Sequence, residues 1–246
     1  MRTTGALMIT GSPAPGAMAP HDRRARWELI GVLALLLVTL AASLLKGQDI
    51  FIFAYIMTVV VALGGPRRHG RPWSDLGIKP GFVDDLRRAW YLVALDLVFQ
   101  VLPPTLVVAF VLGYGRELVD HIASRLPVDV ASSAGLTALA TLLALALVLT
   151  LVEELVYRVT IQERLSWYIG TPAAILVASI LFAVAHAVGT SGTPPVVLTD
   201  VAGVGLDGVI FGLIWAKTRN LAVTWAAHYA TDVLGILALV VVLRAI

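Results

Sequence analysis

Long apolar segments recur along this chain of 246 residues. Several of them approach or exceed the roughly 20 residues that an α-helix needs to cross a hydrocarbon core about 30 Å thick. Hydrophobic residues make up 59% of the sequence and charged residues only 14%, and the mean hydropathy is +0.88. Soluble domains carry about 25% charged residues. The sequence therefore predicts an integral membrane protein.

Seven membrane-spanning helices are predicted from the lengths of these segments, the second being the shortest. They cover residues 27–45, 50–65, 89–113, 135–157, 171–188, 200–217 and 221–243. No repeat of fixed period is visible, and nothing separates the spans into two domains. The predicted fold class is all-α, a polytopic transmembrane helical bundle.

The chain is predicted to begin with a disordered cytoplasmic tail, residues 1–22. This segment is rich in Gly, Pro, Ala and Thr and lacks the continuous apolar stretch of a cleaved signal peptide. Residues 23–246 form the predicted transmembrane domain.

Basic residues cluster beside the spans, in the segment 23–26, the loop 66–88 and the two links that hold Arg164 and Arg219. Because Lys and Arg are retained on the cytoplasmic side, the N-terminus is predicted to be cytoplasmic in a multi-pass protein of the cell membrane. The same clusters explain the sequence pI of about 9.1 without nucleic acid as a partner. The chain has no cysteine, which excludes thiolate nucleophiles and Cys-ligated metals.

Two adjacent carboxylates, Glu153 and Glu154, follow the aliphatic part of the fourth span. An acidic residue at the centre of a membrane helix costs about 2.5–3.5 kcal/mol, so such residues usually face a bundle interior or a wet cavity and mark function. The alternative is an interfacial pair at the end of the span. Neighbouring helical positions point about 100° apart, whereas Glu154 and Arg158 stand at i and i+4. Glu154 is predicted to pair with Arg158, which leaves Glu153 to face a cavity as a general base.

His186 lies near the end of the otherwise apolar fifth span, where a histidine is most often a packed, hydrogen-bonded residue. Its position relative to Glu153 makes it a stronger candidate for a functional residue, since the midpoint between the two residues falls at the turn 170–172. If spans four and five form a helical hairpin, the two residues lie at similar depth. The fourth helix must then continue through Arg158 and Arg164, whose charges would line a wet cavity or lie along the interface.

His228 and Asp232 stand one helical turn apart on one face of the seventh span. An Asp beside a His can fix its tautomer or raise its basicity, both in oriented general bases and around metal ligands. A structural hydrogen bond between spans would explain this pair equally well.

Other polar residues in the spans are weaker candidates for chemistry. Asp96 and Gln100 precede two prolines and indicate a kinked, hydrated third helix, while Asp207 has no evident local partner. The small residues Gly208 and Gly212, four positions apart, predict a close-packing face.

The ordered set Glu153-Glu154-x-x-x-Arg158, Phe182-x-x-x-His186 and His228-x-x-x-Asp232 resembles the motif series of the CAAX prenyl protease and bacteriocin-processing family, also called CPBP or Abi. The resemblance covers about residues 135–243, the expected catalytic core. It implies a helical bundle with a conical polar cavity open to the cytoplasm and the membrane. Members of the family are intramembrane endopeptidases or proteins of related design.

The resemblance also implies roles for the residues of these motifs. Glu153 would activate water with His186, while His228 would polarise the scissile carbonyl or stabilise its oxyanion. Glu154 and Arg158 would support the base. These roles imply a CAAX prenyl protease 2-like glutamic endopeptidase without a cofactor. Its partners would be membrane lipids and a peptide or membrane-protein substrate, with or without a lipid modification, which is expected to enter from the cytoplasmic side.

The sequence departs from the family at Asp232, because the prenyl proteases often carry Asn there. An amide can donate to an oxyanion, whereas an ionised carboxylate cannot. Asp232 is therefore expected to orient His228 or to touch a metal. A zinc-dependent metalloprotease is the alternative, with Glu153, His186 and His228 as ligands.

Two further functions would use the same cavity. A non-enzymatic membrane protein, such as an immunity factor or a peptide-binding scaffold, would keep its function without Glu153. A proton-coupled transporter could use intramembrane Glu and His as a relay. Against transport, the sequence has no inverted repeat and no matched pair of broken helices.

Overall fold

The computed structural model describes residues 23–46, 72–124, 135–187, 190 and 192–245, together with positions 57, 60 and 64. All regular secondary structure with described bounds is helical. The elements are α1 (Arg23–Lys46), the 3₁₀-helix η1 (Trp73–Leu76), α3 (Phe82–Val101), α4 (Pro104–Val111), α5 (Gly115–Ser124), α6 (Gly135–Glu153), the π-helix η2 (Glu154–Gln162), α7 (Glu163–Ile169), α8 (Thr171–Ala187), α9 (Pro194–Thr218) and α10 (Leu221–Ala245).

Four described helical stretches are long and apolar enough to cross a membrane: Phe82–Val111, Thr137–Ile169, Pro194–Thr218 and Leu221–Leu243. The apolar helix α8 is shorter, at 17 residues. Large apolar side chains cover much of the outer surface, where acyl chains can solvate them. The predicted all-α membrane bundle is confirmed. The total of seven spans stays a prediction, since the tail 1–22 and nearly all of 50–65 lie outside the described residues.

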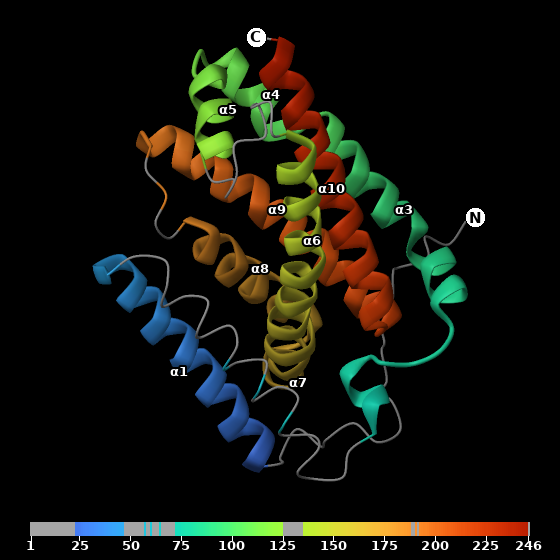
Figure 1. The fold of residues 1–246 in the computed structure, drawn as a ribbon. Helices are drawn as coiled ribbons and strands as arrows, with labels where there is room; N and C mark the ends of the chain where they lie inside the picture. The colour runs from blue at the N-terminus through green and yellow to red at the C-terminus, as the bar shows by residue number, and fades with distance from the viewer. Residues whose placement is uncertain are drawn as a thin grey trace, which may run out of the picture.

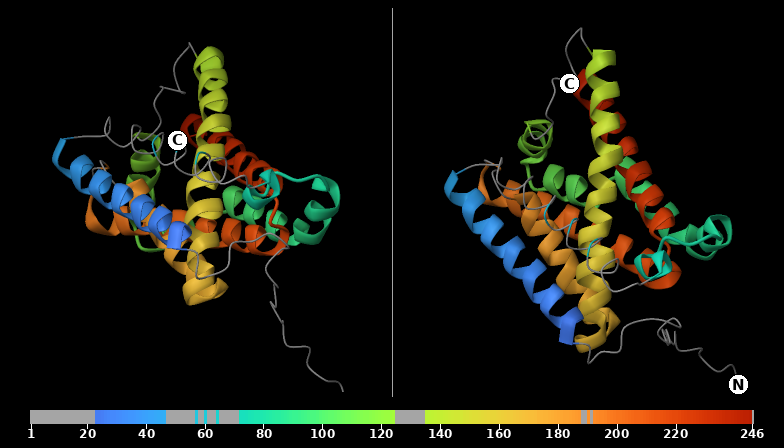
Figure 2. Two further views of the ribbon diagram at one scale, coloured as in Figure 1. Left: turned by 90° about the horizontal axis from the view of Figure 1, so that it is seen from below. Right: turned by 60° about the horizontal axis from the view of Figure 1, so that its bottom comes forward.

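Helices α6 and α10 lie side by side, and α8 packs against α9 (Figures 1 and 2). Helix α3 packs on α9 and α10, while α1 lies against η2 and α7 on the other side of the molecule. Helices α4 and α5 lie at the end of the molecule where α10 ends (Figure 1).

The predicted third span is broken in two. Helix α3 ends at Val101 and α4 begins at Pro104, because proline lacks the N–H group of a continuing helix and disfavours helical geometry in the residue before it. The following helix, α5, was not predicted. It is amphipathic, with Leu118 and Val119 buried and Arg116 exposed.

The fourth span continues far beyond Glu153, as the hairpin prediction requires. Helix α6 passes into η2, in which every residue is buried, and then into α7. The chain turns at Gly170, whose φ of 79° suits glycine, and α8 returns. Neither predicted environment for the two arginines is found. Arg158 and Arg164 are buried inside the protein, 0% and 4% exposed, and each faces a carboxylate.

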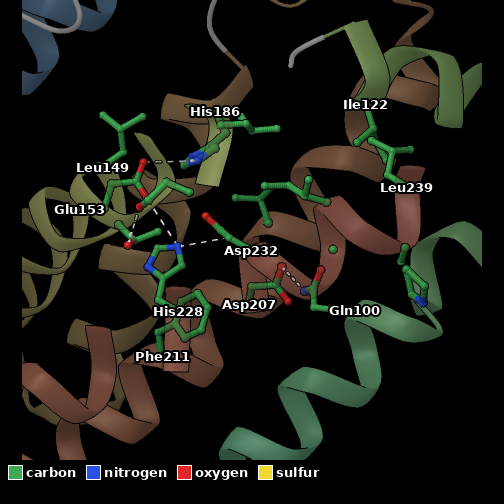
Figure 3. Close-up of a pocket in the computed structure, with 18 of the residues that line it drawn as sticks. Gln100, Ile122, Leu149, Glu153, His186, Asp207, Phe211, His228, Asp232 and Leu239 are labelled. Carbon is green, nitrogen blue, oxygen red and sulfur yellow. Dashed lines mark hydrogen bonds and ion pairs between the residues drawn. The ribbon is translucent and has the colours of Figure 1, made fainter. Parts of the chain in front are cut away.

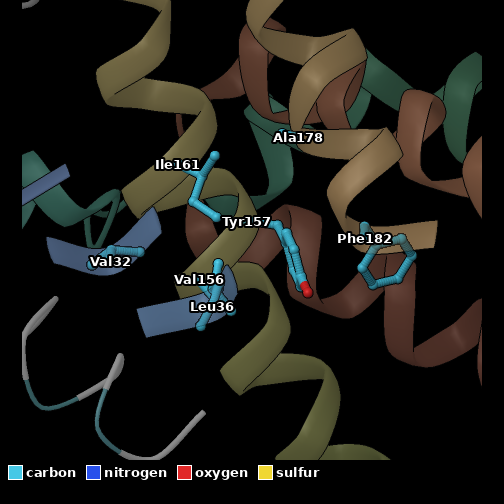
Figure 4. Packing of buried hydrophobic residues seen from close by; sticks show 7 residues of the cluster. All are labelled: Val32, Leu36, Val156, Tyr157, Ile161, Ala178 and Phe182. Atoms are coloured by element: carbon cyan, nitrogen blue, oxygen red, sulfur yellow. The ribbon is translucent and has the colours of Figure 1, made fainter. Parts of the chain in front are cut away.

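An apolar cluster holds the π-helix in place (Figure 4). Tyr157 and Ile161 of η2 pack between Val32 and Leu36 of α1 and Phe182 of α8. The edge-to-face contact of Tyr157 with Phe182 has a centroid distance of 5.1 Å. Burial of these side chains fixes η2 against α8, whose next turn carries His186.

The segments predicted to share the cytoplasmic side meet at one end of the molecule. Lys79 donates a hydrogen bond of 2.7 Å to the carbonyl of Thr218, and the N–H of Leu221 donates to the carbonyl of Gly77 at 2.9 Å. In the same region Arg219 forms an ion pair with Glu163. The loop before α3, helix α7 and the α9–α10 link are thereby joined.

The predicted glycine face of α9 packs closely against α8. A Cβ at Gly208 would meet Ser179 at 3.1 Å, and one at Gly212 would meet Ile175 at 2.9 Å and Gln162 at 3.0 Å. Gln162 also donates a hydrogen bond of 2.8 Å to the Gly212 carbonyl. The absence of side chains here lets α9 approach both α8 and η2.

We predict that Gly212→Ala lowers stability by about 1–3 kcal/mol, because its methyl group overpacks a filled contact. Gly205→Ala in the same helix is the matched control, since its Cβ would meet Ala183 at an ordinary 3.5 Å. Thermal unfolding of both purified variants in detergent checks this. Equal melting temperatures would contradict the close contact at Gly212.

Candidate active site

A cavity of about 450 Å³ lies between α3, α6, α8, α9 and α10 (Figure 3). Its walls are mostly aliphatic. Its titratable and amide side chains are Gln100, Glu153, His186, Asp207, His228 and Asp232. All six were singled out from the sequence. Four were catalytic candidates, and Gln100 and Asp207 were weaker polar candidates.

Glu153 faces two imidazoles in this cavity. Its Oε1 lies 3.7 Å from Nε2 of His186, and its Oε2 lies 3.6 Å from Nε2 of His228. The side chain of Glu153 is 18% exposed. The expected depth match of Glu153 with His186 is confirmed, and α6, α8 and α10 each contribute one of the three groups.

Both imidazoles are oriented through Nδ1. In His186 this atom lies 2.9 Å from the carbonyl of Phe182, and in His228 it lies 2.8 Å from Oε1 of Glu154. A carbonyl only accepts hydrogen bonds, so Nδ1 of His186 carries the proton and donates it. The Nε2 atoms of both rings are thereby directed at Glu153. The ring of His228 is also stacked on Phe211 at a centroid distance of 4.2 Å.

Glu154 pairs with Arg158 as predicted, at 3.6 Å between Oε2 and Nε. The two side chains are 1% and 0% exposed. Phe182 and Phe211 lie 5.3 and 5.9 Å from the guanidinium, so that aromatic rings cover the cation. The pair is therefore compensated within the protein and does not line the cavity.

Asp232 was expected to orient His228 or to touch a metal, but the hydrogen-bond partner of Nδ1 of His228 is Oε1 of Glu154. Asp232 lies on the other side of the ring, with Oδ1 3.8 Å from Nε2. The expectation that adjacent carboxylates serve separate partners was also incomplete, since Glu153 and Glu154 contact opposite nitrogens of His228. Glu154 stands 74 positions from its histidine, a separation that no local pattern detects.

Asp207 has a partner that its own helix does not supply. Gln100 of α3 donates a hydrogen bond of 3.2 Å to its Oδ2 inside the cavity. Asp96, one turn before Gln100, is fully buried and accepts a bond of 2.6 Å from Thr231. The only sequence signal for these contacts was the presence of polar residues in apolar helices.

The cavity extends toward one end of the molecule. Its lining residues stop at Glu153 in the fourth span and start at Phe182 in α8, so the link around Gly170 lies away from it. It extends instead toward α4, α5 and the C-terminal half of α10. The expectation that the substrate enters from the end that carries the link between spans four and five does not fit this cavity.

The side chains of the cavity include His, Asp and Glu, the residue types that bind zinc. Within the described part of the chain, no group of three or more His, Asp or Glu side chains has an arrangement that could hold a metal ion. Glu153, His186 and His228, the ligands of the zinc alternative, are included in that result.

We predict that Glu154→Gln lowers stability by about 3–5 kcal/mol, because it leaves the buried Arg158 without a counter-charge. Glu153→Gln is the matched control and keeps a melting temperature close to that of the wild type, since Glu153 faces the cavity. If thermal unfolding shows equal losses for the two variants, the separation into a structural and a cavity carboxylate is wrong.

Residues 135–234 match a known protein family, described as Type II CAAX prenyl endopeptidase Rce1-like. The match begins with α6 and ends in α10, so it includes Glu153, Glu154, Arg158, His186, His228 and Asp232. No curated protein and no solved structure matches the chain. The resemblance seen in the motifs is confirmed for this segment, which is similar to the Rce1-like family of type II CAAX prenyl endopeptidases.

Proposed function

We propose that this protein is an intramembrane endopeptidase in which Glu153 and His186 activate water and His228 stabilises the oxyanion. One observation carries the proposal: three helices bring Glu153 within 3.7 Å of two oriented imidazoles in a single cavity. General bases and oxyanion donors must lie around one reacting centre, and this arrangement supplies both.

His186 is suited to accept a proton. Its Nδ1 donates to the Phe182 carbonyl, so in the neutral ring Nε2 carries the lone pair beside Glu153. A water molecule bound to the Glu153 carboxylate can transfer its proton to that carboxylate or to Nε2 of His186.

His228 is suited to donate a hydrogen bond to the oxyanion. Glu154, Glu153 and Asp232 lie within 3.8 Å of its ring nitrogens and electrostatically favour the doubly protonated imidazolium. Its Nε2–H can then donate to the carbonyl oxygen of the substrate, which becomes the oxyanion. Asp232 would hold this charge in place, since a carboxylate cannot donate to the oxyanion itself.

The reaction then follows in two steps. The water oxygen bonds to the carbonyl carbon while its proton passes to Glu153, and the oxyanion forms against His228. Collapse of the tetrahedral intermediate breaks the carbon–nitrogen bond, and the proton held by Glu153 passes to the leaving amine. Glu154 and Arg158 serve as positioning residues that orient His228 from behind.

The substrate is proposed to be a peptide or a membrane protein, with or without a lipid modification, surrounded by membrane lipids. The aliphatic walls of the cavity favour an apolar segment next to the scissile bond. A zinc metalloprotease and a non-enzymatic peptide-binding or immunity protein are the alternatives that the experiment below separates from this proposal.

We predict that Glu153→Gln lowers peptide cleavage by about 10²–10⁴-fold, the usual contribution of a general base. The assay is cleavage of a diverse peptide library by the protein purified in detergent. Glu117→Gln, at an exposed position of α5, is the control and keeps wild-type activity.

The same assay with a strong chelator separates the metal-free mechanism from the zinc metalloprotease. Wild-type cleavage that resists chelation is expected from the metal-free mechanism. Loss of cleavage on chelation, with rescue by zinc, would replace it by the metalloprotease. Binding of peptides without cleavage by the wild type would favour the non-enzymatic binder.

We further propose that the basic end of the molecule is cytoplasmic, which keeps the predicted cytoplasmic N-terminus. The end toward which the cavity extends then lies on the opposite side of the membrane. Because the chain has no cysteine, single-cysteine variants report on one site each. We predict that an impermeant maleimide applied from outside labels Arg116→Cys on α5 and spares Lys217→Cys at the end of α9. The reverse pattern would invert the orientation and make the cavity face the cytoplasm.

A further inference from the structure

The cavity is lined by three carboxylates and by no Lys or Arg within the described part of the chain. Glu153 and Asp232 belong to the group around His228, and Asp207 lies apart from them on α9. The buried guanidinium nearest to this group, Arg158, is shielded behind Phe182 and Phe211 and is paired with Glu154. The cavity surface therefore presents an excess of acceptors to any occupant.

Asp207 and Gln100 form a polar pair in an otherwise apolar part of this surface. Gln100 Nε2 donates to Asp207 Oδ2 at 3.2 Å, and this is the one side-chain hydrogen bond that Asp207 makes with a described residue. A Cβ at position 235 would come within 2.9 Å of Gln100 Oε1, so Gly235 leaves room for the amide. The pair offers the second oxygen of Asp207 and the Gln100 carbonyl to a ligand.

This pair lies beside the proposed catalytic groups. In Figure 3 the carboxylate of Asp232 lies between His228 and the Gln100–Asp207 pair. Asp207 interacts electrostatically with both His228 and Asp232. A side chain of the substrate that reaches Asp207 therefore belongs to a residue that flanks the scissile bond.

A further carboxyl group stands behind the pair. Asp96 is fully buried, its Oδ1 has no hydrogen-bond partner in the described structure, and it interacts electrostatically with Asp207. Each of the two carboxyl groups makes ionisation of the other less favourable, so a cation beside Asp207 would offset a repulsion that is already present there. In a site of low dielectric this compensation is strong.

We propose that Asp207 and Gln100 form a specificity subsite for a cationic side chain, Lys or Arg, at a residue flanking the scissile bond. This inference rests on the proposed peptidase function and adds a substrate class to it. An ammonium or guanidinium group donates to the free oxygens of the pair and offsets the repulsion among the carboxylates. A charge-assisted hydrogen bond of this kind is roughly twice as strong as a neutral one.

The test uses peptides of one cleavable sequence that carry Lys, norleucine or Glu at each position flanking the scissile bond. Norleucine keeps the aliphatic stem of lysine and lacks its charge. We expect the lysine peptide to exceed the norleucine peptide in kcat/KM by about tenfold to a hundredfold at one position, and the Glu peptide to be cleaved least. Asp207→Asn should bring the lysine peptide down to the level of norleucine.

In Asp207→Asn the amide oxygen can still accept the hydrogen bond from Gln100. Cleavage of the norleucine peptide by this variant within about twofold of the wild type shows that its active site is intact. Asp84→Asn, an exposed position of α3, is the control for the Asp to Asn change and retains the lysine preference. Cleavage without a lysine preference, or equal losses for both peptides in Asp207→Asn, overturns the inference and leaves the peptidase in place.

Binding separates the inference from the peptidase itself. Isothermal titration calorimetry compares Glu153→Gln with the double variant Glu153→Gln, Asp207→Asn for the lysine and norleucine peptides. A preference for lysine in Kd that the second substitution removes supports the subsite even if the wild type cleaves nothing. Equal Kd values for the two peptides overturn it.

Discussion

The carboxylate of Glu154 lies 2.8 Å from His228 and 3.6 Å from Arg158, at a place where its side chain is 1% exposed. A charge buried at membrane depth is stable only with a partner, and here one carboxylate serves a guanidinium and an imidazole. The contact ties η2 to α10 and directs Nε2 of His228 at the cavity. The arrangement proposed to be catalytic is therefore oriented by a residue that does not line the cavity.

The helix that carries this carboxylate changes geometry at the same point. Glu153 is the last residue of α6 and Glu154 the first of the π-helix η2. π-Helical turns inside α-helices are frequent at functional sites. In η2 the hydroxyl of Thr160 donates to the carbonyl of Leu155, five residues earlier, at 2.8 Å. The wider turn accompanies an arrangement in which two adjacent carboxylates reach opposite nitrogens of one ring.

The molecule is asymmetric along its long direction. One end is basic and closed by contacts such as those of Lys79 and Arg219, whereas the cavity extends toward the end formed by α4 and α5. Acidic groups line that cavity and arginine stays behind aromatic rings. Among the described residues the cavity surface thus carries carboxylates and no Lys or Arg, while the neighbouring Arg158 is paired in the interior. This distribution is the physical basis of the proposed preference for a cationic side chain.

The all-α membrane fold, most helices, the Glu154–Arg158 pair and the meeting of Glu153 with His186 could be predicted from the sequence. Each depends on a pattern that can be read along the chain. These patterns are the length of an apolar segment, the i,i+4 spacing of two residues, and the equal lengths of the two arms of a helical hairpin. The glycine face of α9 was predicted for the same reason, because small residues recur at helical spacing.

Only the tertiary structure decided which partner orients His228, where Asp207 finds its hydrogen bond, and toward which end the cavity extends. Glu154 and His228 are 74 positions apart, and Gln100 and Asp207 are 107 apart, so their contacts follow from how whole helices pack. The packing of the π-helix η2 against α1 and α8 is likewise a property of the tertiary structure. So is the burial of Arg164, which pairs with Glu28 of α1. The sequence by itself determined which polar side chains lie within the membrane-spanning segments. The free-energy cost of placing each one there is a property of the residue itself. Their pairing is a property of the assembled bundle, since a buried charge is compensated by whichever helix the fold brings beside it.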